Sequence, residues 1–197
     1  TSRKPSTAII GGSKISTKIN IIHNLVKYFD NIIIGGAMAN TFLVAQGFEV
    51  GESLVEQELK ETAKTILERG RNFNYNIILP VDVVCSNHLN DSINVRHSEI
   101  KDVLSNQMIL DLGNQTIQII IKTILKSNMI LWNGPLGAFE HEPFNNATIK
   151  IANAIKNNAK LLNIIVLAGG GDTISAIKMA NAEKGFSYIS KAGGAFL

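Results

Sequence analysis

Two glycine-rich segments of the chain carry charged side chains in an arrangement that could bind phosphate. Residues 11–18 (GGSKISTK) hold two lysines four positions apart, Lys14 and Lys18, and residues 169–171 (GGG) run directly into Asp172. Glycine allows a backbone to approach an anion closely, and a helix that follows presents free N–H groups at its positive end. Lysines at this spacing share one face of a helix if the helix begins there. These residues favour a phosphate-bearing ligand over the alternative, solvated surface lysines beside ordinary tight turns.

Asp172 and the Thr173 that follows it have two possible roles. Aspartate and threonine are common N-caps, so both side chains could serve only to start a helix. A carboxylate at this point could instead hold Mg²⁺ against phosphate groups, while the backbone around Thr173 donates N–H groups to them. The two roles are compatible, and the sequence leaves both open.

A third loop, residues 132–140 (WNGPLGAFE), follows an apolar run and has the composition of a rigid strand end. Its aromatic residues, Trp132 and Phe139, are expected in the core. Glu140 could accept hydrogen bonds from ribose hydroxyl groups, or it could simply be exposed to solvent.

Several well-known fingerprints are missing from the sequence. No G-x-x-x-x-G-K-[ST] segment occurs, which excludes a Walker A loop, and no G-x-G-x-x-G follows an expected strand. A hydrolase nucleophile elbow, G-x-S-x-G, is also missing. The four histidines lack metal-ligand spacing and the chain has one cysteine, Cys85, which argues against a zinc site.

The elements that must position these residues repeat the order strand, glycine turn and helix. Short β-branched runs predict strands at residues 7–10, 31–34, 75–84, 108–112, 128–132, 164–167 and 186–189. Helical periodicity predicts helices at residues 19–26, 38–46, 56–69, 116–126, 146–157 and 172–182. Pro80 is expected at a bulge or beyond the hydrogen-bonded part of its strand, Gly70 just past the end of its helix, and residues 88–101 in a loop or ragged hairpin.

This order predicts an α/β fold: a doubly wound, mostly parallel sheet of about six strands with helices on both faces, three-layered and Rossmann-like. The strands are almost continuously apolar, as expected for strands covered on both sides. Neither a linker nor a shift in composition divides the chain, so we expect one domain over residues 1–197. In such a sheet the turns after the strands gather at one edge, where we expect the glycine turns to meet.

Composition narrows the class of protein further. Hydrophobic residues make up 45% of the chain and charged residues 18%, which excludes a disordered protein. A net charge of +3 is too small to indicate nucleic acid or a membrane surface as partner. No apolar run approaches the roughly 20 residues of a membrane span, and a signal-peptide pattern is missing. The single cysteine fits a reducing compartment, and a first residue of Thr1 suggests a piece of a longer protein.

Six segments together resemble the C-terminal, nucleotide-binding domain of the phosphoglycerate kinases. In chain order they are GGSKISTK, IIIGGAMANTFL, LPVDVV, LDLG, LWNGPLGAFE and AGGGDTISA, and they extend over nearly the whole chain. The resemblance implies transfer of a phosphoryl group between 1,3-bisphosphoglycerate and ADP, which gives 3-phosphoglycerate and ATP with Mg²⁺. It also implies a cytoplasmic, monomeric glycolytic enzyme.

The same resemblance assigns roles to individual residues. Lys18 matches a contact to the nucleotide phosphates, and Lys14 matches the lysine that follows the transferring phosphoryl group. Glu140 matches the ribose-binding glutamate, and Asn133 would face the phosphates. The phosphate loop of the family matches four consecutive residues, of which the two glycines would share in catalysis and the aspartate would hold the metal: Gly170, Gly171, Asp172 and Thr173.

The adenine slot is also assigned by resemblance. Its lining would be made by small and apolar residues from five segments: Gly12, Ser13, Gly36, Ala37, Leu54, Leu110 and Gly137. Ala37 stands where a third glycine is common in the family. The last glycine-rich turn usually reads STGGG, and here it is Ser190 followed by Lys191, Ala192 and two glycines.

The resemblance reaches roughly half of a normal enzyme of the family. The other domain, which supplies the basic site for 3-phosphoglycerate, is missing from these residues. We therefore expect the chain to bind Mg-ADP or Mg-ATP but not to turn over alone.

Three other functions are alternatives to a phosphoglycerate kinase domain. A non-catalytic nucleotide-binding module shares every feature of the chain. A Rossmann-type oxidoreductase lacks its glycine fingerprint. A purely structural protein would have no need for the lysines and glycines of these motifs.

Overall fold

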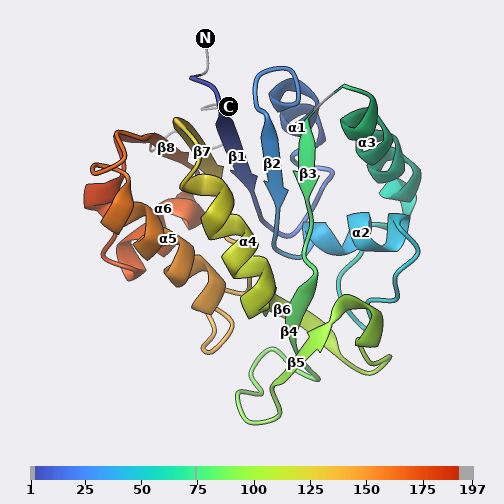
Figure 1. Cartoon of the computed structure of the whole chain (residues 1–197). Coiled ribbons are helices and arrows are strands. Elements are labelled where there is room, and N and C mark those ends of the chain that lie inside the picture. The colour runs from blue at the N-terminus through green and yellow to red at the C-terminus, as the bar shows by residue number, and fades with distance from the viewer. Residues whose placement is uncertain (1–2, 74, 191–197) are drawn as a thin grey trace.

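A six-stranded parallel sheet runs through the middle of the molecule (Figure 1). The computed structural model describes residues 3–73 and 75–190. The strand order is β3-β2-β1-β7-β8-β9, and every neighbouring pair is parallel. The strands are β1 (Ser6–Ile10), β2 (Asn31–Ile34), β3 (Asn76–Ile78), β7 (Met129–Asn133), β8 (Ile165–Gly169) and β9 (Tyr188–Ser190). The predicted doubly wound, mostly parallel α/β fold is confirmed.

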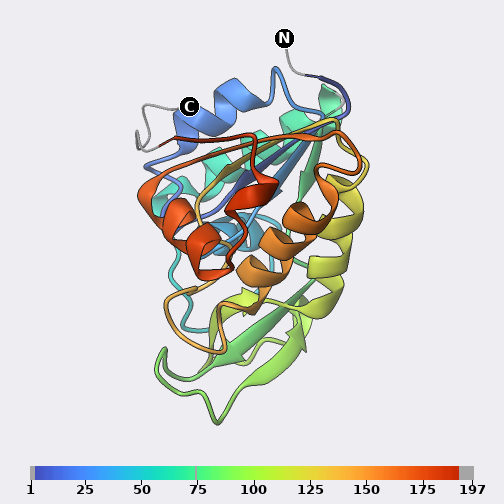
Figure 2. The same cartoon turned by 90° about the vertical axis from the view of Figure 1, so that its left-hand side faces the viewer.

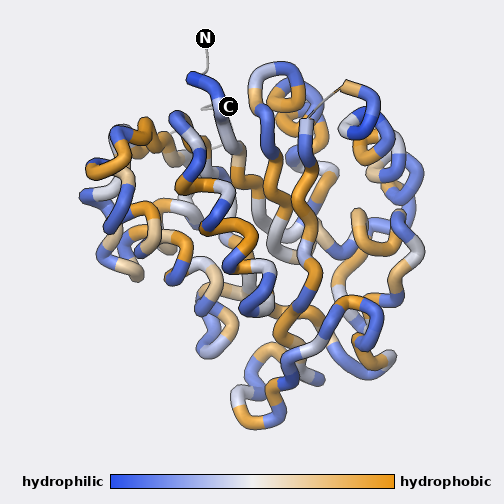
Figure 3. Tube along the Cα trace, in the orientation of Figure 1, coloured by the Kyte–Doolittle hydropathy of each residue, from blue (hydrophilic) through white to orange (hydrophobic). Residues whose placement is uncertain are grey.

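Helices cover both faces of this sheet, and alternate residues of each strand divide between two cores. Ala8 and Ile10 of β1 enter the core under α1 (Ile19–Leu25), α2 (Met38–Ala45) and α3 (Lys60–Asn72). Ile9 enters the opposite core, under α4 (Asn114–Ile124), α5 (Asn146–Asn158) and α6 (Gly171–Met179). The division arises because successive side chains of a strand point to opposite faces. Hydrophobic residues accordingly follow the central strands, whereas hydrophilic residues are frequent on the helices outside them (Figure 3).

A second, smaller sheet lies beyond the end of β3 and is antiparallel (Figures 1 and 2). It has the order β5-β4-β6, with β4 (Asp82–Ser86) between β5 (Arg96–Glu99) and β6 (Met108–Leu112). The prediction of one strand over residues 75–84 is therefore wrong, since β3 and β4 belong to different sheets. Pro80 lies between them, because a residue without an N–H group cannot continue a hydrogen-bonded ladder. Residues 88–101 form the hairpin arm that ends in β5.

The helix expected at residues 56–69 is also displaced. A short 3₁₀ helix (Gln57–Leu59) leads into α3, which continues to Asn72. Gly70 is therefore inside the helix and not past its end. It is buried there against the ring of Tyr75, whose hydroxyl donates to the carbonyl oxygen of Ile66 at 3.2 Å. Two more 3₁₀ helices, Ile100–Asp102 and Glu183–Gly185, complete the assigned helices.

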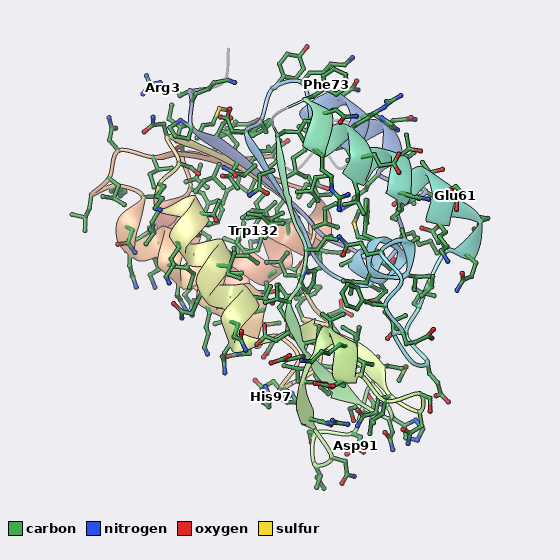
Figure 4. All side chains as sticks on the ribbon, turned by 45° about the vertical axis from the view of Figure 1, so that its right-hand side comes forward. Arg3, Glu61, Phe73, Asp91, His97 and Trp132 are labelled. Atoms are coloured by element: carbon green, nitrogen blue, oxygen red, sulfur yellow. The ribbon has the colours of Figure 1, made fainter. Side chains whose placement is uncertain are left out.

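Trp132 lies at the centre of the molecule, whereas His97 of β5 and Asp91 of the loop between β4 and β5 lie at its end (Figure 4). The indole is fully buried, and its Nε1–H donates to the carbonyl oxygen of Gly134 at 2.8 Å. Phe139 is also buried, so the expectation that both aromatic residues belong to the core is confirmed.

Within the described residues, none of the helices combines the length and the hydrophobicity that crossing a membrane would require. The departure from the family pattern at Lys191 and Ala192 lies outside the described residues.

Candidate functional site

The glycine turns meet between β1 and β7, the two strands from which the sheet extends in opposite directions. From β1 the chain adds β2 and β3 on one side, and from β7 it adds β8 and β9 on the other. The turns after these strands are joined by backbone hydrogen bonds, from Gly11 N–H to Asn133 O at 2.9 Å and from Gly36 N–H to Leu136 O at 2.9 Å. Ligands of open α/β sheets bind in the crevice at such a switch point.

Gly134 shows why these turns need glycine. Its φ of +98° lies in a region that side chains disfavour, and an added Cβ would come within 2.2 Å of the Gly11 carbonyl oxygen. The backbones after β1 and β7 can approach this closely only without a side chain at this position.

A cleft of about 340 Å³ opens between the turns after β1, β7 and β8, and we call it the glycine cleft. Its walls combine glycine backbone with a few polar side chains and one cation. The lining residues are Gly12, Ser13, Thr17, Lys18, Ile21, Asn133, Gly134, Pro135, Gly170, Gly171, Asp172 and Thr173. The structure therefore brings Lys18 and the turn after β8 together, as the sequence predicted.

Lys18 is the cation of the glycine cleft. Its Nζ donates to the carbonyl oxygens of Gly11 and Asn133, the latter at 3.2 Å. Burial lowers the pKa of Lys18 from 10.5 to about 8, and the charge of Asp172 opposes that shift. Because burial disfavours the charged form of an ammonium group, a nearby anion stabilises that form more than it would in water.

The opposite wall is the start of α6. Gly170 occupies the N-cap position, and no side chain caps the helix, so the interpretation of Asp172 or Thr173 as its cap is wrong. The Thr173 hydroxyl instead accepts a hydrogen bond from Gly134 N–H at 2.7 Å, which ties the helix to the turn after β7. Asp172 is left exposed at the first turn of the helix, with its carboxylate available to the cleft.

A second, larger cleft of about 430 Å³ continues from the first, and we call it the apolar cleft. The two share Gly12, Ser13, Pro135 and Asp172. Residues from α2, the small sheet and the loop after β7 line it: Gly12, Ser13, Gly36, Ala37, Ala39, Asn40, Leu54, Pro80, Leu89, residues 108–112, residues 135–141 and Asp172. All seven residues assigned by resemblance to the adenine slot are among them.

Two hydrogen bonds fix the walls of the apolar cleft. Asn40 of α2 donates from Nδ2 to the carbonyl oxygen of Leu54 at 3.2 Å, and Ala138 N–H donates to that of Leu110 at 2.8 Å. Leu54 itself is 52% exposed. Glu140 is exposed at the rim of the same cleft.

Lys14 is the one assigned residue that lines neither cleft. Helix α1 begins only at Ile19, as predicted, so the condition under which Lys14 and Lys18 would share a helix face is not met. Lys14 is exposed beside Glu56, whose carboxylate accepts hydrogen bonds from the backbone N–H of Ser16 at 3.1 Å and from its hydroxyl.

The sequence missed several lining residues because they come from the small sheet and the apolar loops. Asp111, Phe139 and His141 line the apolar cleft without having been assigned to it. For Asp111 a signal was present, since an acidic residue inside the apolar run MILDL needs a partner once it is buried.

The donor set fits Mg²⁺ only together with a phosphate. Among the described residues, no group of three histidine, cysteine, aspartate or glutamate side chains could hold a metal ion. Mg²⁺ usually takes one or two carboxylates and fills its remaining positions with water and phosphate oxygens. The exposed Asp172 carboxylate, beside a cleft of backbone N–H groups, meets that requirement.

The fold and the two clefts define a doubly wound α/β domain with its clefts at the switch point of its sheet. The family model described as phosphoglycerate kinase matches residues 1–197. The chain therefore belongs to the phosphoglycerate kinase family.

Individual relatives agree with this assignment. The phosphoglycerate kinase of Zymomonas mobilis is 45% identical over 193 residues, which are 98% of this chain and 49% of that protein. That of Rhizobium meliloti is 44% identical over 195 residues, or 99% of this chain and 49% of that protein. The chain spans about half the length of the curated relatives it matches.

Two solved structures also match this chain over about half of their own length. Phosphoglycerate kinase from Coxiella burnetii superposes with a TM-score of 0.95 at 39% identity, over 100% of this chain and 49% of that one. The enzyme from Pyrococcus horikoshii, at 24% identity and a TM-score of 0.80 over 98% of this chain and 48% of that one, shares the fold.

Proposed function

We propose that this chain is the nucleotide-binding half of a phosphoglycerate kinase, which interconverts 3-phosphoglycerate and ATP with 1,3-bisphosphoglycerate and ADP. One observation carries the proposal: the cation-bearing glycine cleft and the apolar cleft are continuous at the switch point of the sheet. A nucleotide needs this combination, a polar site for phosphates joined to an apolar slot for a base.

In the glycine cleft, Lys18 and the N-terminus of α6 bind the phosphates. Lys18 exchanges a carbonyl oxygen for a phosphate oxygen, and the negative charge raises its pKa toward the ordinary value. Gly170 and Gly171 bring backbone N–H groups to the phosphate at the positive end of α6. Asn133, with its Nδ2 donating to Gly169 O at 2.7 Å, holds the turn in place.

Asp172 holds the Mg²⁺ that accompanies the nucleotide. The ion supplies neutralisation of phosphate charge when it is bound. The Asp172 carboxylate fixes one side of it at the mouth of the cleft, close to the start of α6.

The apolar cleft takes the base, and its rim takes the ribose. Gly36, Ala37, Leu54, Leu110 and Gly137 present a flat, mostly apolar surface to a purine. Glu140, exposed at the rim, accepts hydrogen bonds from the ribose hydroxyl groups.

The chemistry requires no protein nucleophile. An oxygen of the ADP β-phosphate attacks the phosphorus of the acyl phosphate, and the bond to the carboxylate oxygen breaks. Positioning and charge stabilisation therefore decide the rate. Lys14, exposed outside both clefts, is free to follow the moving phosphoryl group, and the acyl phosphate is held by the half of the enzyme beyond this chain.

Calorimetric titration with MgADP tests the binding. We expect Lys18→Ala and Asp172→Ala each to weaken binding by about tenfold or more. Lys27→Ala and Asp102→Ala remove the same charges from exposed sites outside both clefts, and they should bind as the unchanged chain does. Equal affinities in all five proteins would contradict the assignment.

A coupled assay with 3-phosphoglycerate and MgATP tests the second part of the proposal. We expect no turnover above background from the chain alone, because the second substrate has no site on it. Steady turnover that persists after repeated purification, and disappears in Lys18→Ala, would refute this.

A further inference from the structure

Asp111 is a buried carboxyl group that the proposed function leaves unused. It belongs to β6, the strand that lines the apolar cleft, and its side chain is only 1% exposed. Its Oδ2 accepts a hydrogen bond from Ala147 N–H at 2.9 Å, in the first turn of α5. Its Oδ1 has no partner among the described residues. Oδ2 therefore supports the start of α5, and Oδ1 makes no hydrogen bond with the described residues.

The unpartnered oxygen lies against the turn that forms one wall of the apolar cleft. A Cβ added to Gly137 would come within 2.2 Å of Asp111 Oδ1 and 2.7 Å of the carbonyl oxygen of Phe144. Glycine at 137 thus allows the carboxyl group to reach the back of the turn. The next residue, Ala138, donates its N–H to the carbonyl oxygen of Leu110. Two consecutive residues of β6, Leu110 and Asp111, therefore lie against this wall.

Asp82 makes a useful comparison, because it occupies an equivalent place on β4. It lies against Gly113 as Asp111 lies against Gly137, and it too accepts hydrogen bonds at the start of a helix. Both of its oxygens are satisfied, by Gln115 N–H at 2.9 Å and Thr116 N–H at 2.7 Å. Asp82 does not line the apolar cleft. The two carboxyl groups share a structural role, and only Asp111 adds an unsatisfied oxygen behind a ligand wall.

We propose that Asp111 is a positioning residue for the apolar cleft: its carboxyl group holds the Gly137 turn against β6 and so sets the wall that the base contacts. This inference rests on the proposed function for the identity of the ligand. Asp111 lines the apolar cleft, but its side chain is only 1% exposed, so its role is to support the turn and not to contact the base directly.

The charge of Asp111 makes the positioning sensitive to pH. Burial raises the pKa of Asp111 to about 7, against the opposing effects of the backbone N–H groups of Ala147, Leu112 and Asn146 and of the charge of Lys150. A neutral carboxyl group is tolerated at this buried position, whereas the ionised form places a charge against the Gly137 turn on an oxygen that has no hydrogen-bond partner among the described residues. Other charged or titratable groups on the surrounding elements are Asp82 of β4, Glu140 and His141 of the loop, and Asp172 of α6.

Adenosine is the probe that isolates this wall, because it lacks the phosphates that would engage Lys18 and Mg²⁺. We expect its affinity, measured by amide chemical shifts, to fall about threefold to tenfold as the pH rises from about 6 to about 8.5. Asp111→Asn keeps the shape and cannot ionise, so its affinity should be flat over this range. Asp82→Asn loses a matched helix contact and should keep the sloping profile, even if its melting temperature is lower.

A measurement on the unchanged chain without ligand covers the case in which Asp111→Asn does not fold. The Gly137 and Ala147 amide resonances should titrate together with one midpoint near pH 7, as one ionisation behind the turn requires. A sloping adenosine profile in Asp111→Asn, or Gly137 and Ala147 resonances without a shared midpoint, would overturn the proposal. Failure of the unchanged chain to bind either adenosine or MgADP at any pH would instead remove the proposed function, and the ligand-free titration would still report on the turn.

Discussion

The two clefts of this domain are built by different means. The glycine cleft is made largely of backbone, from turns that directly follow β1, β7 and β8, with Lys18 and Asp172 added. The apolar cleft is made of side chains that come from α2, from residue 54, from β6 and from the loop after β7. One site therefore depends on how closely peptide groups approach one another, and the other on which distant elements the fold brings together.

This difference determines what each cleft tolerates. The glycine cleft should not tolerate a side chain where two backbones approach closely, because a single added Cβ there displaces two strands. A wall of apolar side chains fails gradually, since each residue adds only part of the contact area. The following experiments test that contrast, beginning with the largest expected effect.

Alanine at Gly134 should damage the fold itself. The change places a Cβ 2.2 Å from the Gly11 carbonyl oxygen at a φ of +98°, and we expect it to lower the free energy of unfolding by about 3 kcal/mol or more. Gly47→Ala is the control, because Gly47 has a similar φ of +92° but open space around it, and it should cost about 1 kcal/mol. Urea denaturation measures both. Equal losses would mean that close approach contributes nothing beyond the backbone conformation.

The charge of Lys18 should appear in the pH dependence of stability. Its folded pKa of about 8 lies below the ordinary lysine value of 10.5, so between these values the unfolded chain binds more protons than the folded one. Raising the pH through this range should therefore stabilise the unchanged chain relative to Lys18→Met, by an amount on the order of 1 kcal/mol. The comparison with Lys18→Met removes contributions from other groups, including Cys85, whose pKa burial raises to about 11. Parallel stability curves for the two proteins would contradict the described burial of Lys18.

The smallest effect is expected in the apolar cleft. Leu54 is half exposed, so Leu54→Ala should change the free energy of unfolding by less than about 0.5 kcal/mol. It should weaken ADP binding by about threefold to tenfold through lost contact with the base. Inorganic pyrophosphate, which has no base, should bind the variant and the unchanged chain equally. A loss of pyrophosphate affinity would show that the two clefts are not separable in this way.

Most of the central sheet could be predicted from the sequence, and the small sheet could not. The apolar runs of β1, β2, β7 and β8 are each followed by glycine and by helical periodicity, a local pattern with one common outcome. The run over residues 75–84 has the same composition throughout, and only the placement of Pro80 between two sheets divides it. Likewise Gly70 resembles a helix terminus until the ring of Tyr75 is seen to pack against it.

The candidate site divides in the same way. The residues of the glycine cleft lie in short motifs, and their grouping at one edge follows from parallel strands alone. Asp111 and the other residues that β6 contributes to the apolar cleft belong to the antiparallel sheet. The local pattern predicted a strand over residues 108–112 and a loop or ragged hairpin over residues 88–101, but not that β6 pairs with β4.

The sequence by itself determined the repeated order of strand, glycine turn and helix, and it determined the family. These depend on residue types over short spans of the chain. Only the tertiary structure decided that Lys18 lies in a cleft and Lys14 outside it, and that Asp111 faces Gly137. Burial and contact between residues far apart in the chain depend on how whole sheets and helices pack, and that information is not present in any local stretch.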